Sequence, residues 1–299
     1  MGISEAAAQF PEIISAFFFC IGACAGSFLN VCIIRIPKGE SIVSPPSHCA
    51  CGKPIKWHDN IPILGWFFLR GKARCCGSRI SFRYPLVEFA TAALFLAMWL
   101  VLPPQQAVGG MVFGSLMIFC AGVDIDTMTL PDFATVGGAV LGFGLSLAMP
   151  QIQGEYPDGA PFAAEVIISG ARSAAGIIVG SGVLYWVRTL GGCVLKKEAM
   201  GEGDVILAGC IGAFCGWKGA LFAIFAGSII GALTLVPIAA TKKFSKKKSA
   251  PKKFDDGTEA DPLAFPFGPW LALGALLYYV FLRGFADAYI GSAALLFQF

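Results

Sequence analysis

Long apolar segments alternate with short polar loops along the sequence, and this pattern predicts most of the structure. The apolar segments fall near residues 12–36, 85–103, 107–123, 131–149, 163–189, 204–217, 219–240 and 265–283. Most of them approach the roughly 20 residues that an α-helix needs to cross the hydrocarbon core of a bilayer. The pattern therefore predicts an all-α fold. We expect a polytopic membrane bundle of about eight transmembrane helices, with a small cytoplasmic insert between the first two spans.

Two apolar segments are short for a full crossing. The segment 204–217 is interrupted by Gly209, Gly212 and Gly216, a spacing that suits close contact between helices, so we expect it to be buried among its neighbours. Residues 285–299 are apolar again but too few for a span to be assigned.

The composition agrees with a membrane protein. Apolar side chains make up 56% of the 299 residues and charged ones only 14%, and the mean hydropathy is +0.72, which excludes an ordinary soluble globular protein. The net charge of +3 says little about partners. No Lys or Arg precedes the first apolar run, so we expect that run to remain as a span rather than to be removed as a signal peptide.

Basic residues are concentrated in particular loops, and their placement predicts the orientation. Segments 35–83 and 242–253 hold nine and seven Lys or Arg residues, and both are predicted to be cytoplasmic. The loop 150–162 has none and is predicted to lie outside. We expect three regions: a first transmembrane segment (1–36), a cytoplasmic insert (37–84) and a transmembrane core (85–299) with a Lys-rich cytoplasmic loop at 241–264.

Two aspartate motifs lie at the ends of apolar segments. One contains Asp124 and Asp126, and the other is Gly201-Glu202-Gly203-Asp204. Carboxylates at a membrane are costly unless they pair, face water or do chemistry, and the predicted topology brings Asp124 and Asp204 to the same cytoplasmic face. Two carboxyl groups that share a proton could act as base and acid on a peptide bond. We therefore hypothesise an intramembrane aspartyl peptidase.

The residues around these aspartates suggest accessory roles. Asp124 and Asp126 project about 200° apart on a helix, so only one of them can serve the site fully. Pro131 is predicted at position N1 of the next helix and Asp132 in its first turn, where a carboxylate complements the helix dipole. Gly201 and Gly203 would permit unusual backbone conformations and a close approach of substrate.

Each motif alone could be an ordinary helix cap or turn. The competing interpretation is a proton- or cation-coupled membrane transporter that uses Asp124 and Asp204. Internal repeats would favour a transporter, and the two halves of the chain show no convincing self-similarity.

Several motifs in one order link the chain to a known family. They are Gly26-Ser27-Phe28-Leu29-Asn30-Val31, Asn60-Ile61-Pro62, Arg70-Gly71-Lys72, Tyr84-Pro85-Leu86-Val87-Glu88 and the two aspartate motifs. With them the chain resembles the type IV prepilin peptidases, the bifunctional leader peptidases and N-methyltransferases of type IV pilus and type II secretion systems.

This resemblance implies a function and its residues. Asp124 and Asp204 would be catalytic, and Asp126 and Asp132 match accessory acidic positions. The enzyme would cleave the basic leader of prepilins and pseudopilins after a glycine, at the cytoplasmic face of the bacterial inner membrane. It would then methylate the new amino-terminal residue, generally Phe, from S-adenosylmethionine. The residues themselves offer no sign of that second site, since no Gly-rich loop of the soluble methyltransferase kind is present.

The insert is small, so we predict that it needs a cross-link, either disulfides or a bound metal ion, to be stable. A cytoplasmic location disfavours disulfides, which makes structural zinc the natural choice. The candidate ligands are Cys49, Cys51, Cys75 and Cys76, with His48 as an alternative. The resemblance implies two Cys-x-x-Cys pairs, whereas this chain has a Cys-x-Cys and a vicinal pair, so zinc and unmetallated thiols both stay open.

Aromatic and basic residues are mixed in the same insert. Trp57, Trp66, Phe67 and Phe68 alternate with Lys56, Arg70 and Lys72. The mixture suits either a surface on anionic lipid headgroups or the small core of the insert. The Lys-rich loop is also expected to meet membrane lipid, and nucleic-acid binding is not expected because that basic run is short and adjoins spans.

Overall fold

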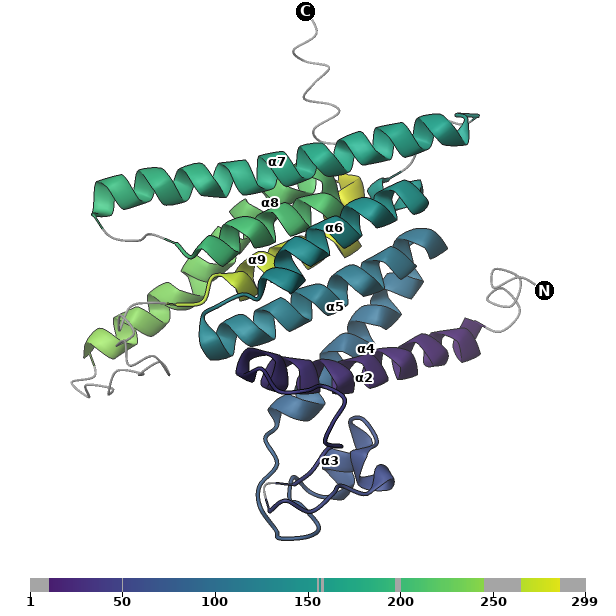
Figure 1. The fold of residues 1–299 in the computed structure, drawn as a ribbon, viewed down its shortest axis with the longest axis vertical. Helices are drawn as coiled ribbons and strands as arrows, with labels where there is room; N and C mark the ends of the chain where they lie inside the picture. Colours follow the sequence, from purple (N-terminus) through teal and green to yellow (C-terminus); the bar gives the residue numbers. More distant parts are fainter. Residues whose placement is uncertain are drawn as a thin grey trace, which may run out of the picture. The chain divides into compact units, whose positions relative to one another are not determined.

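The computed structural model describes residues 11–49, 51–154, 156, 159–196, 200–244 and 265–285. The chain divides into two compact units, residues 1–119 and 120–299, and the division falls inside helix α5 (Pro104–Thr127). Figure 1 shows the helices of both units. The predicted all-α class is confirmed, because the described residues form helices and two isolated β-bridges but no strand.

The first unit is built on an antiparallel pair of helices, α2 (Pro11–Arg35) and α4 (Arg83–Val101). Gly22 and Gly26 let the two backbones approach closely, since a Cβ atom on either would lie 2.7 Å from a Cα atom of α4. Such small residues at four-residue spacing are typical of helix contacts in membranes. The side chain of Asn30 also donates a 3.1 Å hydrogen bond to the carbonyl of Tyr84.

The insert connects the adjacent ends of α2 and α4. It contains two 3₁₀ turns, η1 (Ile36–Lys38) and η2 (Trp57–Asn60), and the short helix α3 (Leu64–Phe68). The indole of Trp66 donates a 3.1 Å hydrogen bond to the carbonyl of Ile80. Its ring faces Gly71, where a Cβ atom would lie 2.9 Å from it, so Trp66 is half-buried and packs inside the insert.

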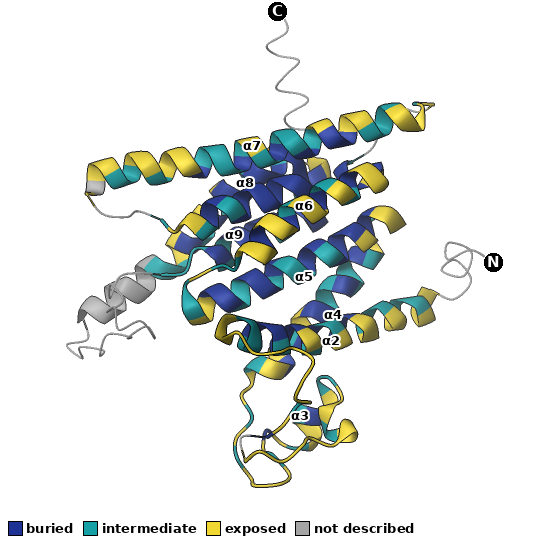
Figure 2. Ribbon diagram, viewed as in Figure 1, coloured by how far each residue is buried: buried dark blue, intermediate teal, exposed yellow. Residues whose placement is uncertain are grey.

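The second unit surrounds helix α8. Its elements after α5 are α6 (Asp132–Ala148), η3 (Pro150–Gln153), α7 (Phe162–Leu195), α8 (Glu202–Phe244), α9 (Gly268–Leu277) and the π-helical turn η4 (Tyr278–Leu282). Helices α6, α7 and α9 all pack against α8. Leu207, Ile211 and Phe214 are fully buried, and Figure 2 shows this concentration of buried residues on α8.

Helix α8 reverses direction at Gly216. This residue has φ 68° and ψ −179°, a conformation that residues with a side chain rarely adopt. A Cβ atom on Gly180 of α7 would contact both the backbone of Ala208 and the side chain of Ala220. In a straight helix those two residues would be about 18 Å apart, so α8 is two arms, residues 202–215 and 217–244, that run back along each other.

The eight predicted apolar segments all lie on helices. Within the described residues, six helices are long and apolar enough to cross a membrane, and Asp132–Ala148 is a shorter apolar helix. The count differs from eight because α6 is short and because segments 204–217 and 219–240 are the two arms of α8. Residues 245–264 of the Lys-rich loop and residues 286–299 lie outside the described part of the chain.

Candidate active site and metal centre

Asp124 lies in the last turn of α5 and is buried, with 5% of its surface exposed. Its Oδ2 atom accepts a 2.9 Å hydrogen bond from the backbone N–H of Gly268, the first residue of α9. The amino-terminal end of a helix carries free N–H groups and a partial positive charge, which stabilise a negative group. The start of α9 therefore fixes the carboxylate of Asp124.

Asp204 lies in the first turn of α8 and is 8% exposed. It is close enough to Asp124 for the charge of that residue to act on it. Both carboxyl groups belong to the second unit, so the fold brings together two acids that are 80 positions apart in the sequence. Carboxyl groups of this kind can accept or donate a proton.

The two aspartate motifs also contact each other through apolar atoms. A Cβ atom on Gly203 would lie 2.9 Å from the Cβ atom of Leu130. Leu130 follows the end of α5 and Gly203 precedes Asp204, so this contact sets the spacing between the helices that carry Asp124 and Asp204. A larger residue at Gly203 would force the two motifs apart.

The remaining predicted residues of the aspartate motifs are arranged as follows. Asp126 and Asp132 are exposed, as expected if only Asp124 of the first pair faces the site. Pro131 was predicted at N1 but lies at the N-cap, and Asp132 is the first helical residue. The proline ring fixes φ at −68° there while ψ is 132°, an extended conformation.

One expectation about Gly201 and Gly203 is wrong. Neither glycine has the positive φ that would require a residue without a side chain. Gly201 is exposed, and a Cβ atom there would meet only Oδ2 of Asp204, at 3.6 Å. The need for glycine at Gly203 comes from the close approach of Leu130.

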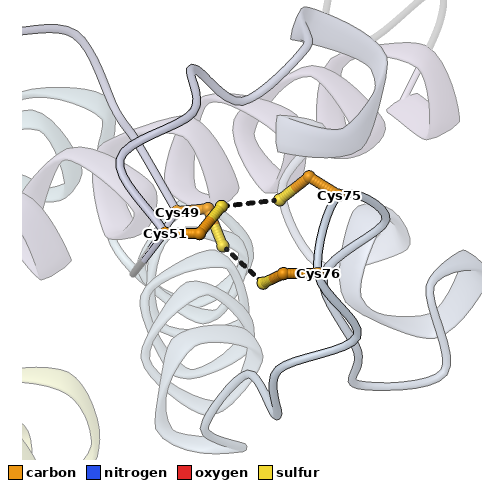
Figure 3. Close-up of side chains that lie close together, drawn as sticks. All are labelled: Cys49, Cys51, Cys75 and Cys76. Atoms are coloured by element: carbon orange, nitrogen blue, oxygen red, sulfur yellow. Dashed lines mark hydrogen bonds between the residues drawn. The ribbon is translucent and has the colours of Figure 1, made fainter.

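Four cysteines of the insert point toward one another (Figure 3). The Sγ atoms of Cys49 and Cys76 are 3.4 Å apart, and so are those of Cys51 and Cys75. All four sulfur atoms lie within 4.8 Å of one another. Each half of the cluster is a tight turn followed by Gly52 or Gly77 in a left-handed conformation, and each thiol pairs with one from the other turn.

This donor set fits a tetrahedral zinc ion. Four thiolates at the usual Zn–S distance of about 2.3 Å lie roughly 3.8 Å from one another, which falls within the range of these sulfur atoms. Cys49 and Cys51 in one turn and Cys75 and Cys76 in the other would supply the four ligands. His48 is not a member of the cluster, and its Nδ1 atom is 3.2 Å from the carbonyl of Pro46.

Hydrogen bonds shift the pKa values of these thiols in opposite directions. The backbone N–H of Cys51, and next the hydroxyl of Ser78, lower the pKa of Cys49 to about 6. The hydroxyl of Ser78 also lowers the pKa of Cys76. Hydrogen bonding to Cys49 and then Cys51 raises the pKa of Cys75 to about 12. The hydrogen bonds thus favour the thiolate, the form that binds metal, at Cys49 and Cys76, and the protonated thiol at Cys75.

The sequence of this chain is similar to those of known proteins along much of its length. Residues 20–102 match the bacterial Peptidase A24 N-terminal domain, and residues 111–236 match the type IV leader peptidase family. A prepilin leader peptidase/N-methyltransferase of Klebsiella pneumoniae is 39% identical over 72% of this chain and 91% of its own. One of Myxococcus xanthus is 36% identical over 76% of this chain and 65% of its own.

A third relative is named a type 4 prepilin-like proteins leader peptide-processing enzyme and comes from Escherichia coli. It is 33% identical over 90% of this chain and 94% of its own. No solved structure matches the chain at a comparable level. The chain belongs to the type IV leader peptidase family. Its helical membrane bundle is thus that of a leader peptidase.

Sequence reasoning missed two residues of this leader peptidase that the structure brings to the site. Gly268 contacts Asp124, and Leu130 contacts Gly203. The sequence does mark Gly268, because Pro266-Phe267-Gly268-Pro269 places a glycine between prolines at the start of an apolar segment. Nothing in that motif indicates which of the other helices it meets.

Proposed function

We propose that this protein is a membrane aspartyl endopeptidase that removes the basic leader of type IV prepilins and pseudopilins by cleavage after a glycine. The new amino-terminal residue, generally Phe, is then N-methylated. The observation that carries the proposal is the proximity of Asp124 and Asp204, two buried acids, in a chain of the leader peptidase family. The names of the relatives support both activities.

The two carboxyl groups have different surroundings and therefore different roles. A hydrogen-bond donor stabilises a carboxylate more than a carboxylic acid, so we assign Asp124, which accepts the N–H of Gly268, as the base. Asp124 takes a proton from a water molecule, and the oxygen of that water attacks the carbonyl carbon of the scissile peptide. Asp204, protonated, donates a hydrogen bond to the carbonyl oxygen. A proton then passes to the leaving nitrogen and the C–N bond breaks.

The methyl donor is S-adenosylmethionine, as the family resemblance implies. Both activities act on the same end of the substrate. The name N-methyltransferase of the relatives supports this activity, and we assign no residue of this chain to binding of the donor.

Zinc has a structural role in the proposal. Cys49, Cys51, Cys75 and Cys76 would hold it and so fix the two turns of the insert. A unit of this size gains from such a cross-link because its apolar core is small. The ion takes no part in peptide cleavage.

The proposed location is the bacterial inner membrane, with the active site on the cytoplasmic face. The basic residues of segments 35–83 and 242–253 support this orientation. The spans contact membrane lipid along their exposed apolar side chains. The transporter alternative gains no support from the three relatives described above, each of which is named as a leader peptidase or leader peptide-processing enzyme.

Removal of the leader from a co-expressed prepilin tests the proposal. Asp124→Asn and Asp204→Asn should each reduce cleavage by at least about a thousandfold, because each removes an essential proton carrier. Glu202→Gln is the matched control, since Glu202 is exposed and only two residues from Asp204. Normal cleavage by either aspartate variant would refute the two-aspartate assignment.

A further inference from the structure

The helix α3 of the insert presents apolar side chains outward. Leu64, Phe67 and Phe68 have 51%, 58% and 76% of their surface exposed. All three belong to a helix of only five residues. Three large exposed apolar side chains on one short helix are unusual in a segment surrounded by water and indicate a contact surface.

Glu88 of α4 fixes where this helix begins. Its carboxylate is buried, with 8% of the residue exposed, and accepts a 2.6 Å hydrogen bond from the backbone N–H of Ile63, the N-cap of α3. Ser27 of α2 also hydrogen-bonds to Glu88. The carboxylate thus joins both membrane helices of the first unit to the start of α3.

The backbone at Ile63 shows how firmly this contact is imposed. Ile63 has φ 63° and ψ −59°, which β-branched residues avoid. The N–H of Leu64 donates a 2.6 Å hydrogen bond to the carbonyl of Pro62, closing a γ-turn around Ile63. Such a turn persists only where its surroundings hold it, and the carboxylate of Glu88 is what holds it here.

The position of Glu88 along α4 gives the depth of α3. Helix α4 has 19 residues and is one of the candidate membrane spans, a length close to the thickness of the hydrocarbon core. Glu88 is five residues after its start at Arg83, about 7.5 Å along the axis. Because Ile63 contacts Glu88, α3 begins near the level of the second turn of α4 rather than out in the cytoplasm.

A second contact supports the same depth. The ring of Trp66 lies 5.4 Å from the ring of Phe82, the N-cap residue of α4. Arg70 and Lys72 follow α3 directly and are exposed. Cations beside apolar side chains at this level match the anionic headgroups of a bilayer, which attract basic residues near the surface.

We propose that α3 is an interfacial membrane anchor. Leu64, Phe67 and Phe68 enter the boundary between headgroups and acyl chains, and Arg70 and Lys72 bind anionic headgroups. Under this proposal the core interpretation applies to Trp66, and the headgroup interpretation applies to the residues of the anchor. The anchor keeps the insert on the membrane surface and does not depend on the peptidase activity.

Photo-crosslinking of the full chain in lipid nanodiscs tests the anchor. The photoreactive residue p-benzoyl-phenylalanine replaces Phe67 or Phe68, and the control places it at Lys53, an exposed residue of the first cysteine turn. Lipid adducts are counted by intact-protein mass spectrometry. We expect severalfold more lipid adduct at Phe67 and Phe68 than at Lys53. Equal yields at the three positions, or adducts formed with an added prepilin in place of lipid, would overturn the proposal.

Two further variants test the parts of the anchor separately. Arg70→Gln with Lys72→Gln should lower the preference for phosphatidylglycerol over phosphatidylcholine by up to about fivefold per charge at low salt. An unchanged preference would remove the headgroup contact. Glu88→Ala should reduce lipid adducts at Phe68, whereas Glu88→Gln, which keeps a hydrogen-bond acceptor, should preserve them. Equal adduct yields in both Glu88 variants would show that the hydrogen bond from Ile63 to Glu88 does not position the anchor.

Discussion

The backbone N–H of Gly268 donates a 2.9 Å hydrogen bond to Oδ2 of Asp124, although the two residues are 144 positions apart. Helix α9 therefore completes a site whose acids come from α5 and α8. The main chain of Gly268 makes this contact. A side chain at position 268 would therefore affect the contact only through its size.

Gly268→Ala should impair leader cleavage. A Cβ atom at this position would lie 2.7 Å from Oδ2 of Asp124, so the carboxylate must turn away or the helix must shift. We expect kcat/KM to fall by about a hundredfold, as for a misplaced catalytic group. Gly137→Ala is the control, because a Cβ atom on Gly137 of α6 meets nothing within 4 Å. Equal activity of the two variants would show that the contact is not required.

Gly203→Ala should also reduce activity, by a different route. The added methyl group would meet Leu130 at 2.9 Å and separate the two aspartate motifs. Leu130→Gly in the same chain removes the side-chain atoms that the methyl group would meet, the Cβ atom included, so the double variant should recover most of the lost kcat/KM. Measurement of both single variants and the double variant gives the coupling directly. Strict additivity of the two effects would contradict the contact.

The pH dependence of cleavage should be bell-shaped. A pair that works with one shared proton is inactive when both carboxyl groups are protonated and again when both are ionised. The acid and alkaline limbs of a kcat/KM profile then report apparent values for the pair rather than for either aspartate. The profile is measured with one prepilin and a constant ionic strength. If kcat/KM does not change with pH, shared-proton chemistry is excluded.

Purified protein should contain about one zinc ion per chain, since four thiolates complete its tetrahedral shell. Cys51→Ser and Cys76→Ser should each lower the zinc content measured by elemental analysis, because each removes one ligand of the cluster. Cys193→Ser is the control, since Cys193 is exposed and outside the cluster. Full zinc content in both ligand variants would place the ion elsewhere, and its absence from the natural chain would leave the thiols unmetallated.

Local sequence patterns indicated which residues carry the candidate site but not how they are held. Helical geometry predicted that only one of Asp124 and Asp126 faces the site, and the family resemblance selected Asp124. The structure buries Asp124 and exposes Asp126. The turn containing Pro131 was also predicted, with an error of one position. The predicted boundary between segments 204–217 and 219–240 lies within two residues of the reversal at Gly216. The sequence did not show that Gly216 is the residue whose backbone conformation allows the reversal.

The sequence by itself determined the all-α membrane class, the eight apolar segments, the two acidic motifs and the four cysteines, because each follows from composition or from spacing within a short stretch of chain. Only the tertiary structure decided that Gly268 binds Asp124, that Leu130 packs on Gly203 and that Glu88 holds Ile63. These contacts join residues far apart in the chain, and they depend on close packing of helix backbones, which no local pattern encodes.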